Sequence, residues 1–440
     1  MGKIVHSKQI INDWENFDEN LNIVLQDTLN NKKSIEPFPL LSLIDDPEIH
    51  LTNSRKFSKN ITSDLNNNIH KKISENSIIK VGYFSADFNE HAVSNLIFKM
   101  LSKHNKNKFK IYCYAFGFEN KDNFHKAIEN VVDIYRDIRD ISDYNAALLA
   151  RKDGIDIAID LQGYTDKHRV NIFSNRAAPI QVNFLGYPGS MGADFIDYII
   201  ADKNLIPENK NNFYSEKIIY LPHSYQPQND EMKISDNIPS KKELDLPEDH
   251  FIFCAINNTY KITPQTFDVW MNVLKKVKRS ILWLLEDNDT SKSNLIKEAK
   301  MRGINNKRLV FAKRTSHDKY LAQFKYADLY LDTFIYNAGA TASNALWMGL
   351  PVLTMSGNSY SARMATSLLN SVGLGDLITN SIEDYQKLAI DLSSNIKKLN
   401  SIKEKLRKNI SEKPLFDTDL YIKNFENGLN QIFDNYIKGN

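Results

Sequence analysis

The chain has 440 residues, of which 42% are hydrophobic and 11% aromatic, enough for two domains with cores of their own. Its formal net charge is +2, so the charge balance gives no reason to expect nucleic acid or an anionic membrane as a partner. The two cysteines lie in apolar runs, and no apolar run approaches the roughly 20 residues that span a bilayer, which together favour a cytoplasmic protein with buried free thiols.

The N-terminal part of the chain is polar. Residues 1–37 carry apolar side chains at helical spacing, and we expect one polar helix that ends at Pro37. Residues 51–78 are rich in Asn, Lys and Ser, a composition typical of a loose connector with room for one helix. We therefore assign residues 1–78 to a helical extension and connector.

Apolar runs of strand length alternate with helical stretches from residue 79 onward. This order indicates a mostly parallel sheet with helices on both faces. Residues 224–248 are polar and have little periodicity, so we place the interdomain linker there. A first Rossmann-like domain, on the acceptor side, is therefore expected at 79–235. Its predicted strands are 79–85, 109–116, 155–161, 181–185, 198–201 and 218–221.

A second series of the same kind begins at Phe251. Its first helix should start at Pro264, because Thr263 is a natural N-cap. We assign 245–400 to a second Rossmann-like domain and 401–440 to C-terminal helices. Two such domains imply a cleft in which ligands bind at the carboxyl ends of strands. The strands predicted in this series are 251–256, 281–285, 309–311, 329–332 and 352–355.

The stretch 334–347 joins a short apolar strand to a helical pattern. Small residues crowd the turn at Gly339, Ala340 and Thr341, so a ligand could approach the backbone closely. The free N–H groups and the positive dipole end of the new helix would suit a phosphate. The alternative is an ordinary strand-to-helix loop capped by Thr341 or Ser343.

Nine short motifs stand in a recognisable order along the chain. They are VGYFSADF at 81–88 with His91, RAAPIQ at 176–181, LGYPG at 185–189, YSEK at 214–217, LPH at 221–223, NNTYKI at 257–262, LWLL at 282–285, LDT at 331–333 and ALWMGLP at 345–351.

With these motifs the chain resembles the catalytic region of the protein O-GlcNAc transferases of glycosyltransferase family 41, in particular the bacterial members. The resemblance runs from about residue 38 to the C-terminus. It implies an α/β fold of the GT-B class, in which two Rossmann-like domains face a cleft that holds a UDP-sugar.

The resemblance also implies roles for single residues. Lys261 matches the family lysine that faces the diphosphate, and His91 matches the family histidine near the sugar and the acceptor. The donor-binding residues that it implies are Asn258, Leu185, Gly186, Pro188, Thr165, Tyr320, Gly339, Ala340, Thr341 and Asn344.

Several positions depart from the family pattern. Relatives usually have His, Thr and Asp at the positions of Gly339, Ala340 and Asn344, and His at that of Tyr320. Asn344 can still accept a hydrogen bond from a ribose hydroxyl, more weakly than a carboxylate would, and Tyr320 can still stack on uracil. Relatives also carry long tetratricopeptide arrays that guide the protein acceptor. This chain has at most one or two helices there, so a separate repeat-containing protein is a candidate partner.

Two Asp-x-Asp strings, 287–289 and 417–419, have the spacing of a metal motif, but both stand in polar turns. We therefore expect no metal or other cofactor, with the diphosphate charge met by Lys261 and a helix N-terminus. Asp160 lies in an apolar strand. It is either a base with a raised pKa or, as we favour, a residue that ties down a neighbouring loop.

The prediction is an inverting, metal-independent glycosyltransferase that moves GlcNAc or a related sugar from UDP to Ser or Thr of a protein. One alternative keeps the donor and changes the acceptor to a glycan, lipid or small molecule. The other is a non-catalytic module that binds a nucleotide sugar or a partner protein.

Overall fold

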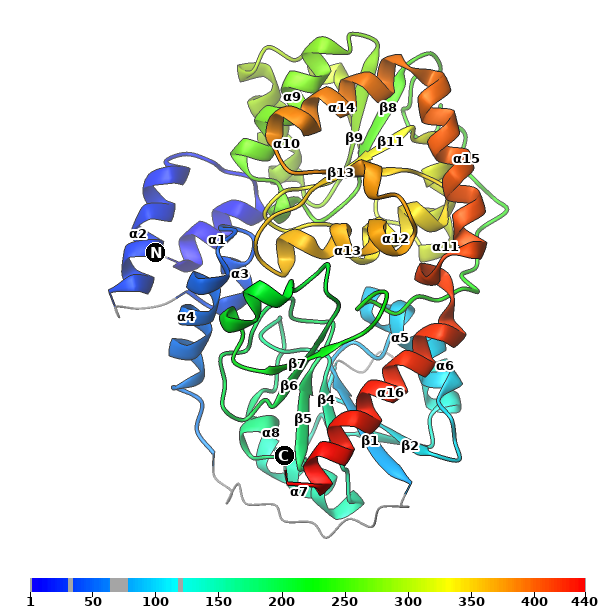
Figure 1. Cartoon of the computed structure of the whole chain (residues 1–440). Coiled ribbons are helices and arrows are strands. Elements are labelled where there is room, and N and C mark those ends of the chain that lie inside the picture. Colours follow the sequence, from blue (N-terminus) through cyan, green and yellow to red (C-terminus); the bar gives the residue numbers. More distant parts are fainter. Residues whose placement is uncertain (1, 31–34, 64–77, 118–121, 440) are drawn as a thin grey trace. The chain divides into compact units, whose positions relative to one another are not determined.

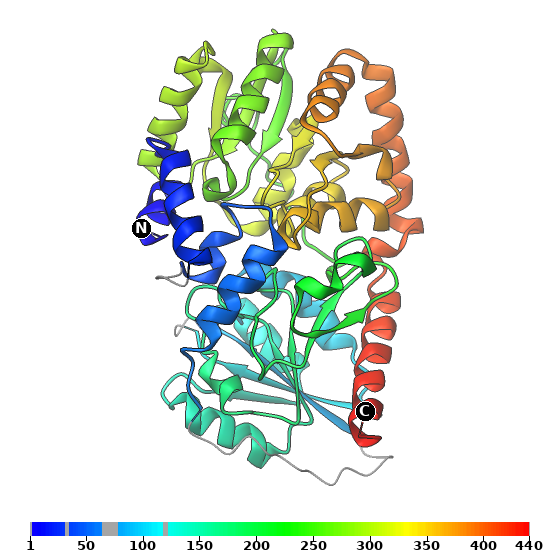
Figure 2. The ribbon, with the colours of Figure 1, turned by 60° about the vertical axis from the view of Figure 1, so that its left-hand side comes forward.

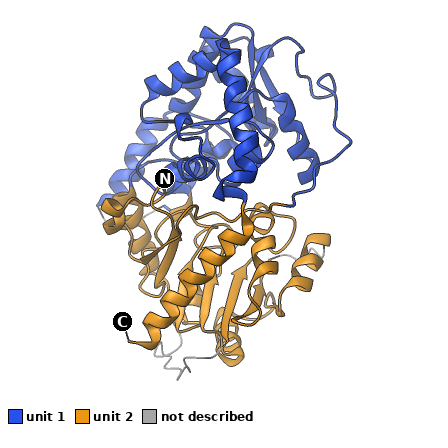
Figure 3. Ribbon diagram, turned by 45° about the vertical axis from the view of Figure 1, so that its right-hand side comes forward, with its two compact units in different colours: residues 1–35, 39–46, 231–416 blue, residues 36–38, 47–230, 417–440 orange. Residues whose placement is uncertain are grey.

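The computed structural model describes residues 2–30, 35–63, 78–117 and 122–439. They form two compact units, which Figure 3 shows in different colours. Each unit is built around one parallel sheet with helices packed against it, the two-sheet α/β architecture that the sequence predicted (Figure 1). Unit 1 contains residues 1–35, 39–46 and 231–416, and unit 2 contains residues 36–38, 47–230 and 417–440.

Unit 2 holds a seven-stranded sheet in the order β3-β2-β1-β4-β5-β6-β7, with every neighbouring pair parallel. Most of its strands are apolar runs, as parallel strands covered on both faces require. The strands are β1 Ile79–Ser85, β2 Phe109–Ala115, β3 Ile134–Asp137, β4 Ile157–Asp160, β5 Ile180–Asn183, β6 Tyr198–Ala201 and β7 Lys217–Tyr220. The helices are α4 Pro47–Ser58, α5 Ala92–Lys103, α6 Asn123–Val131, α7 Asp143–Asp153, α8 Asn171–Ser174 and α16 Thr418–Ile437.

Unit 1 holds a six-stranded parallel sheet in the order β10-β9-β8-β11-β12-β13. The strands are β8 Phe251–Ala255, β9 Ser280–Leu285, β10 Leu309–Ala312, β11 Leu329–Leu331, β12 Val352–Met355 and β13 Ile378–Thr379. The helices are α1 Gly2–Ile10, α2 Phe17–Leu29, α9 Pro264–Lys276, α10 Asp289–Met301, α11 His317–Gln323, α12 Ala340–Trp347, α13 Met364–Ser371, α14 Ile382–Ser394 and α15 Ile396–Glu412.

Each sheet has one place where the strand order reverses. In unit 2 it lies between β1 and β4, and in unit 1 between β8 and β11. The loops that leave neighbouring strands at such a switch point run in opposite directions and leave room for a ligand at the carboxyl edge. Four loops are therefore of interest, those that follow β1, β4, β8 and β11.

The prediction of one helix over residues 1–37 was wrong. The chain forms α1 and α2 instead, because Asn12 and Asn16 both adopt left-handed backbone angles, with φ of 52° and 56°. A single residue in that region ends a right-handed helix, and asparagine tolerates it better than most residues. A short helix, α3 Pro37–Leu40, follows, and residues 64–77 of the expected connector lie outside the described part of the chain.

The compact units divide the chain differently from the expected ranges. Residues 1–35 pack with unit 1, and the C-terminal segment 401–440 is shared, because unit 1 ends at Phe416 and α16 belongs to unit 2. There α16 buries Phe425 and Leu429 in the core of the unit 2 sheet. Both cysteines are buried and free, as predicted. None of the described helices has the length and apolar character to cross a membrane.

Candidate functional site

The loop after β8 places a lysine inside unit 1. A short 3-10 helix, Thr259–Lys261, precedes α9, and Thr263 caps α9 by accepting a hydrogen bond from the Thr266 N–H at 3.2 Å, as predicted. Lys261 is only 7% exposed. Its ammonium group donates to the carbonyl of Asn337 at 3.0 Å and lies 4.1 Å from the ring centroid of Tyr336. The lysine therefore spans the switch point from the β8 loop to the β11 loop.

A buried carboxylate, Asp332, organises the β11 loop. One of its oxygens accepts from the backbone N–H groups of Thr333 at 2.9 Å and Ala338 at 2.7 Å, and the other accepts from the Thr354 hydroxyl at 2.7 Å. Burial raises the pKa of Asp332 and lowers that of Lys261, while the attraction between the two charges opposes both shifts. The loop is thus held rigid beside a poorly solvated cation.

Helix α12 begins at Ala340, directly after this loop. Gly339 occupies the N-cap position, so no side chain caps the helix, and its first turn contains no acidic residue. Neither Thr341 nor Ser343 caps the helix, as the alternative interpretation supposed: Thr341 already lies in the first turn, and the Ser343 hydroxyl donates to the Ala340 carbonyl at 3.0 Å. The start of α12 is partly exposed, so the backbone N–H groups of its first turn can donate hydrogen bonds to an anion.

Three of the predicted donor-binding residues meet at this end of α12. Tyr320, on α11, has the side chains of Thr341 and Asn344 beside its hydroxyl, where they act against the effect of burial, which raises the pKa of that group. The Asn344 amide also lies 3.4 Å from Nε2 of His317, one turn earlier on α11. Sequence reasoning missed His317. Its signal was its position three residues before Tyr320, on the same face of a helix.

Asn258, in the β8 loop, is partly exposed and accepts from Arg314 at 3.2 Å. Arg314 also pairs with Asp287, whose second oxygen accepts from Thr259 at 3.1 Å, and Asn288 caps α10. The string 287–289 thus serves to fix loops.

The string 417–419 serves helix α16 in the same way. Asp417 caps that helix, and Asp419 pairs with Lys103 at 2.6 Å. Over the described ranges, no group of three or more His, Cys, Asp or Glu side chains is arranged to hold a metal ion.

Unit 2 has a different network at its switch point. The Gln162 side chain, after β4, accepts from the Ala86 N–H at 3.1 Å and donates to the Thr165 hydroxyl at 2.9 Å, which ties the β1 and β4 loops together. Nδ1 of His91 caps α5 by accepting from the Val93 N–H at 3.3 Å, and the imidazole side chain is 45% exposed. Oδ2 of Asp87 lies 3.5 Å from the same nitrogen, so Nδ1 has both a hydrogen-bond donor and an acceptor beside it.

Asp160 ends β4. One oxygen accepts from the N–H groups of Gln162 and Gly163, both at 2.9 Å, which confirms the interpretation that it ties down a loop. Burial raises the pKa of Asp160 to about 6, and its other oxygen is buried without a hydrogen-bond partner among the described residues.

The LGYPG loop after β5 has a constrained backbone. Leu185 has φ of 71°, a left-handed value that costs a non-glycine residue about 1–2 kcal/mol. A Cβ on Gly186 would lie 1.9 Å from the Leu161 carbonyl, so only glycine fits there. Pro188 is buried, and the Asn183 amide holds the Gly189 carbonyl at 3.0 Å. Strain kept in place by hydrogen bonds is typical of functional loops.

The two parallel sheets with their switch-point loops define the two-sheet α/β class to which GT-B glycosyltransferases belong. The profile of the family described as Glycosyl transferase family 41 matches residues 59–232 and 227–425. The chain therefore belongs to glycosyl transferase family 41, as the sequence motifs predicted.

Among its relatives is a probable UDP-N-acetylglucosamine–peptide N-acetylglucosaminyltransferase, SEC, of Arabidopsis thaliana, which is 30% identical over 99% of this chain and 47% of its own length. The corresponding protein of Caenorhabditis elegans is 25% identical over 82% of this chain and 41% of its own length. The chain thus spans about half the length of the curated relatives it matches.

Among solved structures, a mutant O-GlcNAc transferase of Thermobaculum terrenum shares the fold. It aligns with a TM-score of 0.82 and 24% identity over 91% of this chain and 76% of its own.

Proposed function

We propose that the chain is an inverting, metal-independent glycosyltransferase that transfers GlcNAc, or a related sugar, from UDP to a Ser or Thr hydroxyl of a protein. Family membership supports the class of reaction, and relatives named peptide N-acetylglucosaminyltransferases support the donor and acceptor. In this proposal unit 1 binds the UDP-sugar, and the carboxyl edge of the unit 2 sheet serves the acceptor.

The observation that carries the proposal is the buried ammonium group of Lys261 beside the uncapped start of α12. During transfer, the acceptor oxygen forms a bond to the anomeric carbon while the bond from that carbon to the β-phosphate oxygen breaks. Negative charge then grows on the departing UDP. A preorganised cation and helix N–H groups stabilise such charge without any reorganisation at the moment of reaction.

The acceptor hydroxyl must also lose its proton. His91 and the leaving diphosphate are the two candidate bases. In the tautomer in which Nδ1 accepts from the Val93 N–H, the neutral His91 ring presents an N–H at Nε2 and orients an oxygen by donating to it. In the other tautomer Nδ1 carries the proton and faces Oδ2 of Asp87 at 3.5 Å. Acting as the base would require the other tautomer.

A transfer assay tests the proposed function. The full chain is incubated with UDP-GlcNAc and a panel of other UDP-sugars, with a protein lysate as acceptor, and modified peptides are mapped by mass spectrometry. We expect an added hexosamine, or a related sugar, on Ser or Thr, and equal rates with and without EDTA. Activity that EDTA abolishes and magnesium or manganese restores would contradict the metal-free mechanism, and modification of glycans or lipids alone would contradict the protein acceptor.

A further inference from the structure

Helix α1 lies against the 3-10 helix Thr259–Lys261 of unit 1. Figures 1 and 2 show the N-terminal helices, in dark blue, beside the green part of that unit. The side-chain amide of Gln9 donates to the Tyr260 carbonyl at 2.8 Å and to the Ile262 carbonyl at 3.3 Å. These two peptide groups flank Lys261, although Gln9 and Tyr260 stand 251 positions apart in the chain. One side chain therefore holds the backbone on both sides of the lysine.

A second amide extends this contact. Asn12 donates to the Thr259 carbonyl at 2.9 Å and accepts from the Ser291 hydroxyl. The left-handed backbone of Asn12 turns the chain after α1. The Asn294 side chain donates a hydrogen bond to the carbonyl of Ile11 at 2.8 Å. Gln9 and Asn12 are each only 1% exposed. The carbonyl groups of Thr259, Tyr260 and Ile262 thus all accept hydrogen bonds from the N-terminal segment.

Helix α1 does not dock through an apolar face. Of its nine residues only Val5 and Gln9 are buried. A helix that contributes mainly to stability buries a stripe of apolar side chains, whereas α1 buries an amide that is directed at the Lys261 loop. Because the buried amide of Gln9 is bonded to the Lys261 loop, α1 is better suited to position that loop than to contribute apolar burial.

We propose that Gln9 and Asn12 are positioning residues of the donor site, which fix the backbone around Lys261 and so hold its ammonium group at the Asn337 carbonyl beside the start of α12. The inference rests on the proposed role of Lys261 in binding the diphosphate. A catalytic group held to within a fraction of an ångström keeps its effect, and loosening it by about 1 Å can lower the rate by about 100-fold.

Several charged or titratable groups surround Lys261 and bear on its protonation. Asp332 favours the protonated form, whereas burial opposes it. The remaining groups are Tyr336 at 4.1 Å, Tyr260 on the same loop, His6 of α1 with its ring 6.5 Å from that of Tyr260, and Asp287, whose charge acts on Tyr260. Because burial dominates, any loosening of the loop should raise the Lys261 pKa toward that of an ordinary lysine.

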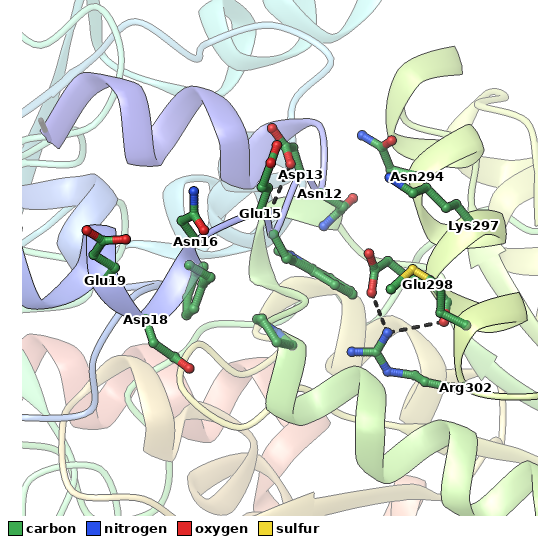
Figure 4. Close-up of a pocket in the computed structure, with 14 residues that line it drawn as sticks. Asn12, Asp13, Glu15, Asn16, Asp18, Glu19, Asn294, Lys297, Glu298 and Arg302 are labelled. Carbon is green, nitrogen blue, oxygen red and sulfur yellow. Dashed lines mark hydrogen bonds and ion pairs between the residues drawn. The ribbon is translucent and has the colours of Figure 1, made fainter.

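Two variants and two matched controls separate positioning from general stability. Gln9→Met removes both donors and keeps the side-chain volume, and Asn12→Gly removes the amide while permitting the left-handed backbone. The control for Gln9→Met is Gln26→Met on the exposed face of α2. The control for Asn12→Gly is Asn16→Gly, because Asn16 has φ of 56°, is exposed and lines the open pocket drawn in Figure 4.

The readout is the acylation rate of Lys261 in the full chain as a function of pH, with modified peptides quantified by mass spectrometry. Lys80, which donates to the Asp153 carbonyl in unit 2, is measured in the same samples as a report on the fold. We expect the midpoint of Lys261 labelling to rise by about one pH unit or more in Gln9→Met and Asn12→Gly, and to stay unchanged in both controls. Turnover of UDP-GlcNAc should fall roughly tenfold in kcat with a smaller change in KM.

Unchanged Lys261 midpoints in both variants would overturn the inference. Parallel changes at Lys261 and Lys80 would also overturn it, because they indicate a general loss of structure. A wild-type chain that turns over no UDP-sugar would refute the proposed function, whereas the labelling midpoints would still decide whether α1 positions Lys261.

Discussion

The two sheets carry aspartates at equivalent places, and the surroundings of these aspartates differ. Asp160 ends β4, next to β1, and Asp332 follows β11, next to β8. Each accepts two backbone N–H groups from its own loop. Only Asp332 has its second oxygen bound and a lysine close enough to affect its pKa. In both sheets an aspartate thus fixes its loop by accepting backbone hydrogen bonds. Lys261 is the feature that makes unit 1 suited to an anion.

The largest effect should come from removing that lysine. Lys261→Ala should lower kcat by about two to three orders of magnitude, because it removes a preorganised charge that matters most as UDP departs. UDP affinity, measured by calorimetry, should fall much less because the N–H groups of α12 remain. Lys325→Ala is the control, since Lys325 is exposed and lies 4.7 Å from the ring centroid of Tyr326. A loss confined to UDP affinity would favour the non-catalytic binding module.

The histidine of unit 2 should matter less. His91→Ala should lower kcat by roughly 100-fold, the lower end of the range for a group that moves or orients a proton, with UDP affinity unchanged. His91→Asn is the second variant, because its side chain can still cap α5. Equal loss in both variants would show that the imidazole itself is needed, and no loss in either would remove His91 from the mechanism.

The two aspartates should respond differently to amide substitution. Asp332→Asn should lower the free energy of unfolding by about 2 kcal/mol in urea titrations at pH 7, because it weakens three hydrogen bonds to a buried group. Asp160→Asn should change it by less than about 1 kcal/mol, because one oxygen can keep both N–H bonds and the other has no partner among the described residues.

Asp160 should also make stability depend on pH. Its folded pKa of about 6 lies above the unfolded value of about 3.9, so the folded state binds more protons in this range. The contribution of Asp160 to the free energy of unfolding should therefore be present below pH 4 and be lost as the pH rises through 6. In Asp160→Asn this pH-dependent decrease should be absent. A steeper pH dependence in the variant would contradict the assignment.

The smallest effect concerns the ribose. Asn344→Asp should tighten UDP binding by about 1 kcal/mol if this side chain meets ribose hydroxyls, since a carboxylate is the stronger acceptor. Uridine should show the same gain, and 2′,3′-dideoxyuridine should show none. Equal or weaker binding of both UDP and uridine would mean that Asn344 only joins α12 to Tyr320 and His317.

Strands were predicted well where they are buried on both faces. β1, β6 and β12 have the predicted bounds, because their apolar runs end sharply. β3 was missed because its residues, Ile-Tyr-Arg-Asp, are half-buried or exposed, and β13 because it has only two residues. The break between α1 and α2 depends on two left-handed asparagines, which no periodicity reveals.

The site was predictable residue by residue but not as a set of contacts. Motifs pointed to Lys261, whereas its partner Asn337 lies 76 positions away and could not be read from spacing. The same holds for Gln162, whose reach to Ala86 depends on β1 and β4 being neighbours in the sheet. The alternative cap of α12, Thr341 or Ser343, was suggested because Thr and Ser are common caps, whereas Gly339 occupies that position in the structure.

The most direct test of the central claim is the acylation of Lys261 in the presence of UDP, UMP or uridine. Burial lowers the Lys261 pKa in the free chain, so a bound diphosphate should raise it and slow labelling at pH values below the pKa of an ordinary lysine. We predict strong protection by saturating UDP, weaker protection by UMP and none by uridine, with Lys325 unaffected throughout. Equal labelling of Lys261 with and without bound UDP would contradict the claim that this lysine meets the diphosphate.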